Sequence, residues 1–193
     1  PFSAETDVSP ESLAADQLFR DQLVALIPSL RSFARGLCGW RDMADDMVQE
    51  AMLRGWAARA SFTPGTNFRA WMFMILRNQF YTALRKDKRM TVWDPEVAER
   101  VLVEAPAQQE AIHGADVARA LQKLPPEQRE VLLLIGANGV SYEEAAEVIG
   151  CAIGTIKSRL ARGRKALALL IDGPEGEALI DRSKGEARFD KVA

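Results

Sequence analysis

Residues 141–167, SYEEAAEVIGCAIGTIKSRLARGRKAL, have the pattern of two helices joined by a tight turn. Ser141 and Glu144 form the S-x-x-E pattern of a capping box, which satisfies free backbone amides at the start of a helix. Gly150 can adopt a positive φ, so a three-residue turn that begins there leads into a second helix over about 153–170. The sequence therefore predicts a helix-turn-helix.

The second of these helices has separate apolar and basic faces. Its apolar face carries Ile153, Ile156, Leu160 and Leu167. Roughly 145° away, at 100° per residue, lie Lys157, Ser158, Ala161, Arg162 and Lys165. A face of cationic and small side chains can enter the major groove of DNA, where Arg and Lys pair with guanine O6 and N7. Cap, turn and faces together predict DNA binding.

Three further helices are predicted upstream, at about 19–37, 42–59 and 68–86. On the middle helix, small and apolar side chains share the side that should face the core: Ala44, Met47, Val48, Ala51 and Gly55. The opposite side is polar with one exposed leucine: Asp42, Asp46, Gln49, Glu50 and Leu53. Spacing alone does not decide whether this polar stripe is a solvated helix face or a binding surface.

The segment SFTPGTNF, residues 61–68, must be a loop, with Thr66 or Asn67 as N-cap of the helix that follows. One strip of that helix interleaves aromatic, amide and cationic side chains: Trp71, Met74, Arg77, Asn78, Tyr81, Arg85 and Lys88. Such a strip suits unstacked bases, each worth about 1 to 3 kcal/mol on an aromatic face. The alternative is that Trp71 and Tyr81 are core aromatics with basic neighbours.

Charge is distributed unevenly, although the net charge is only -2. Residues 23–89 hold eleven basic and five acidic residues, a net +6, between acidic stretches. Residues 90–114 form an acidic linker that could span about 80 Å when extended, so the flanking domains need not touch. Residues 1–19 are a flexible lead-in, and residues 173–193 have no readable function. We expect an all-α fold of two small helical domains.

Several classes of protein are disfavoured. Cys38, Cys151 and the single His113 lack zinc-ligand spacing, so we expect no metal, no cofactor and reduced thiols. No apolar run approaches the roughly 20 residues that span a membrane, which indicates a soluble, cytoplasmic protein. The carboxylates Glu143, Glu144 and Glu147 have no nucleophile or histidine partner, so an enzyme is not expected.

Four motifs in family order carry a resemblance: DMADDMVQEAMLRGW, SFTPGTNFRAWMFMILRN, LPPEQREVLLL and the helix-turn-helix. They resemble extracytoplasmic-function (ECF) sigma factors over about 150 residues. GTNFRAW together with LLIGANGVSYEEAAE is similar to the alphaproteobacterial general-stress subgroup EcfG. The resemblance implies a sigma-2 domain at 20–89 and a sigma-4 domain at 115–172, with the linker in place of a sigma-3 domain.

The resemblance also implies roles for individual residues. Binding to core RNA polymerase, at the β′ coiled coil, falls to Asp46, Gln49, Glu50 and Leu53, and the sigma-4 domain meets the β flap. Reading and melting of the minus-ten element falls to Ser61, Asn67, Phe68, Trp71, Arg77, Asn78, Tyr81 and Arg85. Reading of the minus-thirty-five element falls to Thr155, Lys157, Ser158, Arg159 and Arg162. Ala161 and Gly163 depart from the family pattern, so the base preference cannot be carried over.

These features predict a promoter-specificity subunit without catalysis, held inactive by an anti-sigma factor of the NepR type. One alternative is a sigma mimic that titrates the anti-sigma factor without binding DNA, but a mimic should lose the basic reading face. Another is a helix-turn-helix repressor, which would be a symmetric dimer on two half-sites.

Overall fold

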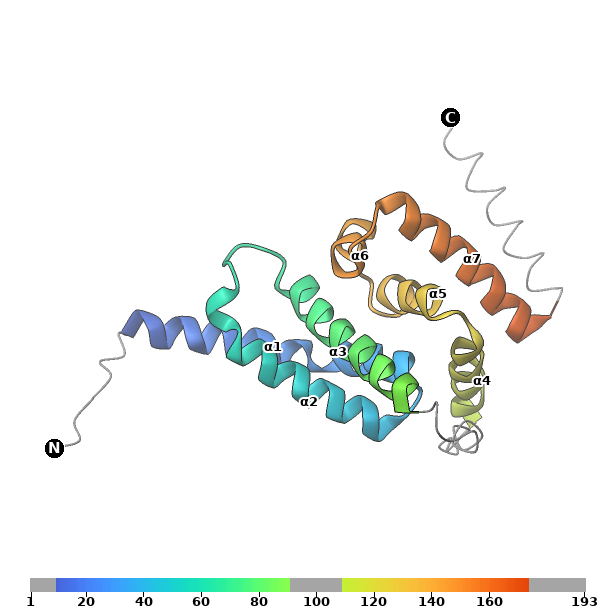
Figure 1. The fold of residues 1–193 in the computed structure, drawn as a ribbon, viewed down its shortest axis with the longest axis horizontal. Coiled ribbons are helices and arrows are strands. Elements are labelled where there is room, and N and C mark those ends of the chain that lie inside the picture. Colours follow the sequence, from blue (N-terminus) through green and yellow to red (C-terminus); the bar gives the residue numbers. More distant parts are fainter. Residues whose placement is uncertain (1–9, 91–108, 174–193) are drawn as a thin grey trace.

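The computed structural model describes residues 10–90 and 109–173, and within them all regular structure is helical. Figure 1 shows two neighbouring helical domains along the long axis of the molecule, the first in blue to green and the second in yellow to red. The predicted all-α fold of two small domains is confirmed. Most of the predicted linker, and all but the first residue of the predicted C-terminal extension, lie outside the described residues.

The first helix begins earlier than the sequence predicts. α1 (Pro10–Cys38) runs for 29 residues, so the prediction of a flexible segment over residues 1–19 is wrong for residues 10–19. Phe19 is buried, and Asp16 forms an ion pair with Arg59 at 2.9 Å. α1 is therefore held by tertiary contacts from Asp16 onward, which polar composition does not reveal.

Two helices pack on α1 to complete the first domain. α2 (Arg41–Ala57) buries the five residues predicted from spacing: Ala44, Met47, Val48, Ala51 and Gly55. α3 (Phe68–Met90) follows the short helix η1 (Arg59–Ser61) and buries Met72, Phe73 and Leu76. A Cβ at Gly55 would lie 2.7 Å from the Met72 sulfur, so this glycine lets α2 and α3 approach closely.

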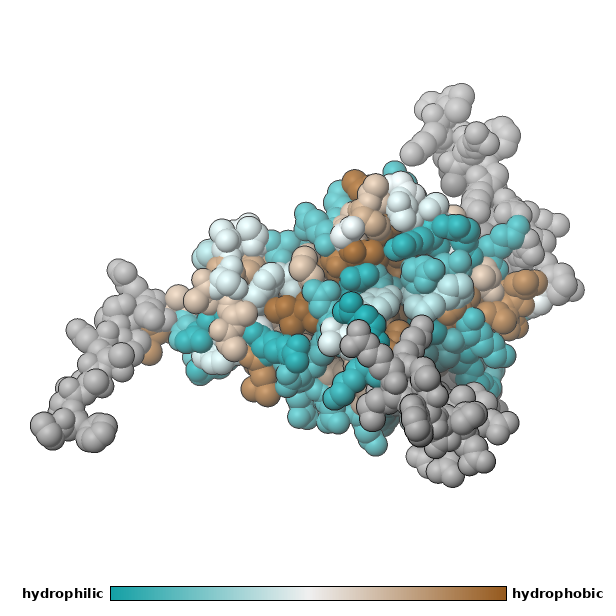
Figure 2. All heavy atoms as spheres, in the orientation of Figure 1, coloured by the Kyte–Doolittle hydropathy of each residue, from teal (hydrophilic) through white to brown (hydrophobic). Residues whose placement is uncertain are grey.

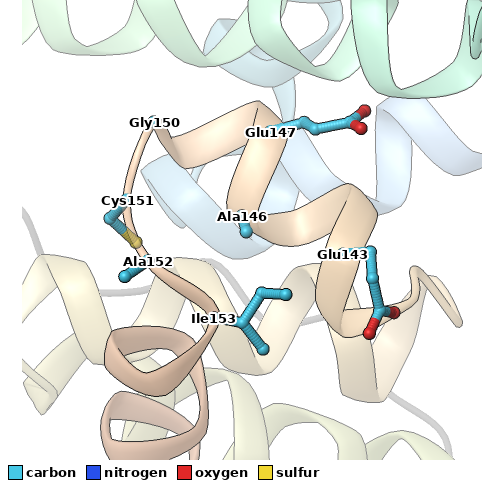
Figure 3. Close-up of a pocket in the computed structure, with 7 residues that line it drawn as sticks. All are labelled: Glu143, Ala146, Glu147, Gly150, Cys151, Ala152 and Ile153. Carbon is cyan, nitrogen blue, oxygen red and sulfur yellow. The ribbon is translucent and has the colours of Figure 1, made fainter.

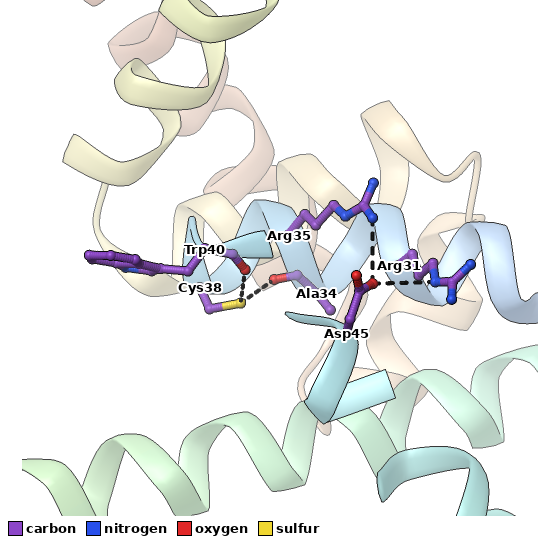
Figure 4. A network of polar contacts seen from close by, with 6 residues as sticks. All are labelled: Arg31, Ala34, Arg35, Cys38, Trp40 and Asp45. Atoms are coloured by element: carbon purple, nitrogen blue, oxygen red, sulfur yellow. Dashed lines mark hydrogen bonds and ion pairs between the residues drawn. The ribbon is translucent and has the colours of Figure 1, made fainter. Parts of the chain in front are cut away.

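Polar contacts hold the turn between α1 and α2, as Figure 4 shows. Asp45 of α2 accepts from Arg31 Nε at 3.3 Å and from Arg35 Nη2 at 3.4 Å. Cys38 Sγ donates to the carbonyl of Ala34, one turn earlier, at 2.8 Å. Exposed ion pairs add little stability one by one, so the two arginines on this carboxylate supplement the apolar packing of α2 on α1.

The second domain consists of shorter helices, namely α4 (Gln109–Lys123), α5 (Pro126–Val131), η4 (Leu132–Ala137), α6 (Tyr142–Ile149) and α7 (Ile153–Asp172). Pro126 occupies the first position of α5, where its fixed φ suits a helix and its missing N–H costs nothing. η4 continues α5 in wider, π-type turns. α4 begins within the predicted linker, six residues before the predicted start of the second domain.

The two domains pack directly against each other, although the linker length predicted that they need not touch. α3 lies against α6, and α1 lies against η4 (Figure 1). Gly36 permits this close approach, since a Cβ there would overlap the side chain of Leu133. Buried side chains from both domains form one hydrophobic cluster. The two domains therefore form one packed unit in this structure.

Polar groups reinforce this contact at the end of α1. Gln122 Nε2 donates to the Gly36 carbonyl at 2.8 Å, and Arg129 Nη1 donates to the Leu37 carbonyl at 2.8 Å. The last carbonyls of a helix have no partner within it. The second domain supplies those partners for α1.

Apolar side chains stay exposed at a few places on the surface. Figure 2 shows a hydrophobic patch near the C-terminal end of α7, where Leu169, Leu170 and Ile171 are 42 to 47% exposed. The most exposed large apolar side chain in the described part of the chain is Leu53 of α2, at 65%.

Candidate nucleic-acid interface

The helix-turn-helix forms as the sequence predicts. Glu144 N donates to Ser141 Oγ at 3.1 Å and Ser141 N donates to Glu144 Oε2 at 2.8 Å, which completes the capping box of α6. Gly150 has φ of 75°, in the left-handed region that glycine adopts without strain. Figure 3 shows the turn from Gly150 to Ala152 leading into α7.

The basic face of α7 is open to solvent. Lys157, Ser158 and Arg162 are exposed, whereas Thr155 and Arg159 are half-buried. Arg162 Nε donates to the Ser158 carbonyl at 3.3 Å, and Lys157 Nζ lies 5.8 Å from the centre of the Tyr142 ring. These contacts are weak and local, so the two cations can turn toward phosphates or base edges without losing a buried partner.

Gly163 does not belong to the reading face. It is buried, and a Cβ there would lie 3.0 Å from Leu132 Cδ1 and 3.3 Å from the Gln128 carbonyl. α7 therefore packs tightly on α5 and η4 at this point, and the glycine serves the core of the second domain. Its departure from the family pattern does not bear on base preference, whereas Ala161 remains half-exposed.

The loop between η1 and α3 is held at both ends and exposed at its tip. Ser61 Oγ donates to the Ala58 carbonyl at 2.7 Å, and Asn67 Oδ1 caps α3 by accepting from Ala70 N at 3.0 Å. Asn67 is thus the N-cap, one of the two predicted. Residues 63–66 are exposed. A rigid base with an exposed tip suits contact with an unstacked nucleotide.

Aromatic rings form the base of this loop. Phe19 makes edge-to-face contacts with the rings of Trp56, Phe62, Phe68 and Trp71 at centroid distances of 5.0 to 6.1 Å. Such pairs add stability beyond the burial of the rings. Trp71 is half-buried in this cluster, so the alternative of a core aromatic describes it better than a free stacking platform.

The strip on α3 is divided between solvent and the second domain. Asn78 and Arg85 are exposed. Arg77 Nε donates to Glu130 Oε1 at 2.8 Å, and Tyr81 Oη donates to the other carboxylate oxygen. The Glu130 side chain is only 1% exposed. The structure therefore does not present the predicted minus-ten residues as one open surface.

The polar stripe on α2 remains accessible. Asp46 and Gln49 are exposed, and Glu50 forms an ion pair with Arg54 at 2.7 Å. Leu53 stands among them at 65% exposure. Single exposed apolar residues are common on protein surfaces, so the exposure of Leu53 fits both a solvated face and a binding surface.

Two pKa shifts report on the contact between the domains. The pKa of Glu144 is lowered, first by the hydrogen bond from the Ser141 amide and next by the bond from the Asn67 side chain. The pKa of Tyr81 is raised, first by burial and next by its bond to Glu130. At neutral pH Glu144 thus accepts as a carboxylate and Tyr81 donates as a phenol.

Comparisons with known proteins identify the family of this chain. A model of sigma-70 region 2 matches residues 23–90, and a model of sigma-70 region 4 matches residues 115–167. The ECF RNA polymerase sigma factor EcfG of Rhodopseudomonas palustris is 47% identical over 158 residues, which cover 81% of this chain and 87% of that protein. The chain belongs to the ECF family of RNA polymerase sigma factors. Sigma factors of this family are initiation factors without catalysis, so the chain is not an enzyme.

Solved structures resemble this sigma factor over most of its length. The sigma factor RpoE of Bartonella quintana, in complex with the anti-sigma factor NepR, shares 41% identity with a TM-score of 0.71 and covers 82% of this chain and 99% of that one. CnrH in complex with the cytosolic domain of CnrY shares 26% identity with a TM-score of 0.63, covering 84% and 95%.

Sequence reasoning missed the residues of this sigma factor that join its domains. Arg69 donates to the Asn138 carbonyl, Asn67 Nδ2 donates to Glu144 Oε1, and Glu130 accepts from α3. Glu130 follows two prolines in a short helix and shows no periodicity that would predict burial. The available signal was that Glu130 directly precedes the apolar run 131–135.

The described residues of the sigma factor give no support for a paired-carboxylate site, a metal site or a membrane span. In Figure 3 the carboxylates of Glu143 and Glu147 extend separately from α6 and do not converge. Within residues 10–90 and 109–173, no cluster of His, Cys, Asp or Glu could hold a metal ion. None of the helices in those stretches has the length and apolarity needed to cross a membrane.

Proposed function

We propose that this sigma factor binds core RNA polymerase through the outer face of α2 and directs it to promoters of general stress genes in the cytoplasm. The observation that carries the proposal is the pair of matched domains, each with an exposed face of suitable chemistry. Leu53 within the polar stripe of α2 supports a contact with a polymerase helix, such as the β′ coiled coil.

The second domain reads the minus-thirty-five element. Lys157, Ser158 and Arg162 stand exposed on one face of α7, where a cation can reach guanine and a hydroxyl can reach any base. Thr155 and Arg159 lie at the edge of that face, in position for the phosphates. The β flap meets this domain away from the reading face.

The first domain reads and opens the minus-ten element. Exposed residues 63–66 form the tip that receives an unstacked base, with Ser61, Asn67 and Phe68 as its frame. Asn78 and Arg85 continue the surface along α3, and Arg77 and Tyr81 join it when Glu130 is withdrawn. Trp71 acts by positioning Phe68 and the loop rather than by touching a base.

Control is by an anti-sigma factor of the NepR type. The support is the likeness to EcfG and to a sigma factor solved together with NepR. Simultaneous binding of a NepR-like protein and core polymerase to one sigma factor molecule would contradict this mode of control.

Run-off transcription from a library of stress promoters, with purified core polymerase and with or without this protein, tests the function. We expect transcripts from a discrete subset of promoters, each starting at a fixed site. Leu53→Glu should lose transcription, because it places a charge in the proposed polymerase contact of α2. Absence of transcripts from the unmodified protein, with tight NepR binding retained, would instead identify a sigma mimic.

A further inference from the structure

Three residues near the start of α1 contact the segment that leads into the proposed minus-ten loop. Asp16 Oδ1 accepts from Arg59 Nε at 2.9 Å, and Asp16 Oδ2 accepts from Arg59 Nη2 at 3.4 Å. One turn later, the guanidinium carbon of Arg20 lies 5.5 Å from the centre of the Trp56 ring. Asp16, Phe19 and Arg20 are three and four residues apart, so they share one side of the helix. In Figure 1 the end of α2 lies beside this part of α1.

Arg59 connects α1 to the residues just before the loop. Its Nη1 donates to the Trp56 carbonyl at 3.2 Å, and its guanidinium carbon lies 4.5 Å from the centre of the Trp56 ring. Arg59 is the first residue of η1, which ends at Ser61. A guanidinium that meets both oxygens of a carboxylate has a restricted orientation. Asp16 therefore restrains Arg59 two residues before the loop begins.

Phe19 packs against both ends of the same loop. Its ring centre lies 6.1 Å from that of Phe62, which precedes the exposed tip, and 5.0 Å from that of Phe68, which follows the tip. The rings of Phe62 and Phe68 also contact each other, at 5.2 Å. The side of α1 that carries Asp16 is thus continuous with the aromatic base of the loop.

The exposed tip, residues 63–66, forms a turn of its own. Thr66 N and Thr66 Oγ1 both donate to the Thr63 carbonyl, at 3.2 and 2.7 Å. Extruding a base from a duplex is unfavourable, and the protein must offset that cost. A loop that is ordered before it binds loses less conformational freedom on binding, so the same contacts give a higher affinity.

We propose that Asp16 is a positioning residue for capture of the minus-ten base, because through Arg59 it keeps the loop ordered before DNA binds. The proposal rests on the proposed function, since it concerns the loop assigned there to the unstacked base. Asp16 acts through Arg59 and does not touch the base. It lies before residue 23, where the match to sigma-70 region 2 begins.

Binding of single-stranded DNA by the holoenzyme tests the proposal with the variant Asp16→Asn. The probe is a fluorescent oligonucleotide with the minus-ten sequence of a promoter that the protein transcribes, used intact and with one abasic position at a time. The abasic position that weakens binding of the unmodified protein most marks the captured base. Asp16→Asn should weaken binding of the intact oligonucleotide about three- to fivefold, the size expected for a partly exposed ion pair. Binding of the oligonucleotide without the captured base should not change.

Two further variants control for charge and for folding. Asp21→Asn removes the same charge from the same helix, but Asp21 is exposed and accepts from Gln17 of α1 at 2.9 Å. It should keep the ratio of the two affinities unchanged. Asp16→Glu restores the carboxylate and should recover most of the lost affinity. An equal loss on both oligonucleotides, as partial unfolding would give, would overturn the proposal, and so would an unchanged affinity of Asp16→Asn for the intact one.

Amide hydrogen exchange of the free protein measures the order of the loop without DNA. The amides of Ser61, Phe62 and Thr66 are hydrogen-bonded within this segment, so their exchange reports its local opening. Asp16→Asn should speed their exchange about three- to fivefold, and Asp21→Asn should leave it unchanged. Absence of transcripts from the unmodified protein would refute the proposed function separately. The exchange rates would then still decide whether Asp16 orders the loop, and unchanged rates would overturn the proposal.

Discussion

Replacing Phe19 by alanine should destabilise the first domain by about 3 to 4 kcal/mol, within the range measured for buried aromatic side chains. Phe19 is only 8% exposed and contacts four aromatic rings, so its removal leaves a cavity that rigid neighbours cannot fill. In a protein of this size, a loss of about 1 kcal/mol lowers the Tm by roughly 2 to 4 °C. The Tm of Phe19→Ala should therefore fall by roughly 6 to 16 °C. Thermal unfolding followed by circular dichroism measures it.

Leu18→Ala is the matched control for this prediction. Leu18 is the preceding residue of the same helix but is 61% exposed, so its truncation should change stability by less than about 0.5 kcal/mol. Equal Tm values for Phe19→Ala and the unmodified protein would refute the reasoning. They would mean that the early turns of α1 do not dock on the loop that precedes α3.

Four further predictions test individual surfaces. Arg162→Ala should weaken activity on promoters that need the minus-thirty-five sequence by about 1 to 3 kcal/mol, and an equal loss on every DNA in a binding assay would mark a phosphate contact instead. Gly163→Val should cost about 1 to 3 kcal/mol in denaturant unfolding, because its side chain would enter the space of Leu132. Leu53→Glu should lower affinity for core polymerase in a pull-down titration without lowering the Tm, since Leu53 is exposed. The lowered pKa of Glu144 means that its contribution to stability is present at neutral pH and is lost as pH falls below about 4.5, so Glu144→Gln should flatten the acid limb of a Tm-against-pH curve.

Local structure was predictable where the residues that determine it lie within one helix or one turn. The core face of α2, the capping box at Ser141 and the left-handed Gly150 all follow from residue type and spacing. The docking of Asp16 and Phe19 was not predictable, because both meet partners more than thirty residues away. Periodicity reports that a helix has an apolar face but not which element covers it.

The sequence predicted which residues belong to the candidate site, but it did not predict the contacts that they make in the folded chain. Arg77 and Tyr81 are of residue types that bind nucleic acid. Sequence does not reveal that both donate hydrogen bonds to Glu130 in the folded chain. Gly163 shows the opposite error, since a glycine between reading-face residues faces the domain core. In both cases the deciding contact joins elements distant along the chain, where composition carries no information.

The bond between Asn67 and Glu144 has a mechanical consequence. Each side chain caps its own helix with one oxygen, Asn67 Oδ1 for α3 and Glu144 Oε2 for α6. The bond between the domains uses the remaining atoms, Asn67 Nδ2 and Glu144 Oε1. Parting the domains therefore costs neither helix its first turn, so separation can proceed at the microsecond to millisecond pace of rigid-body motion rather than at the slower pace of unfolding.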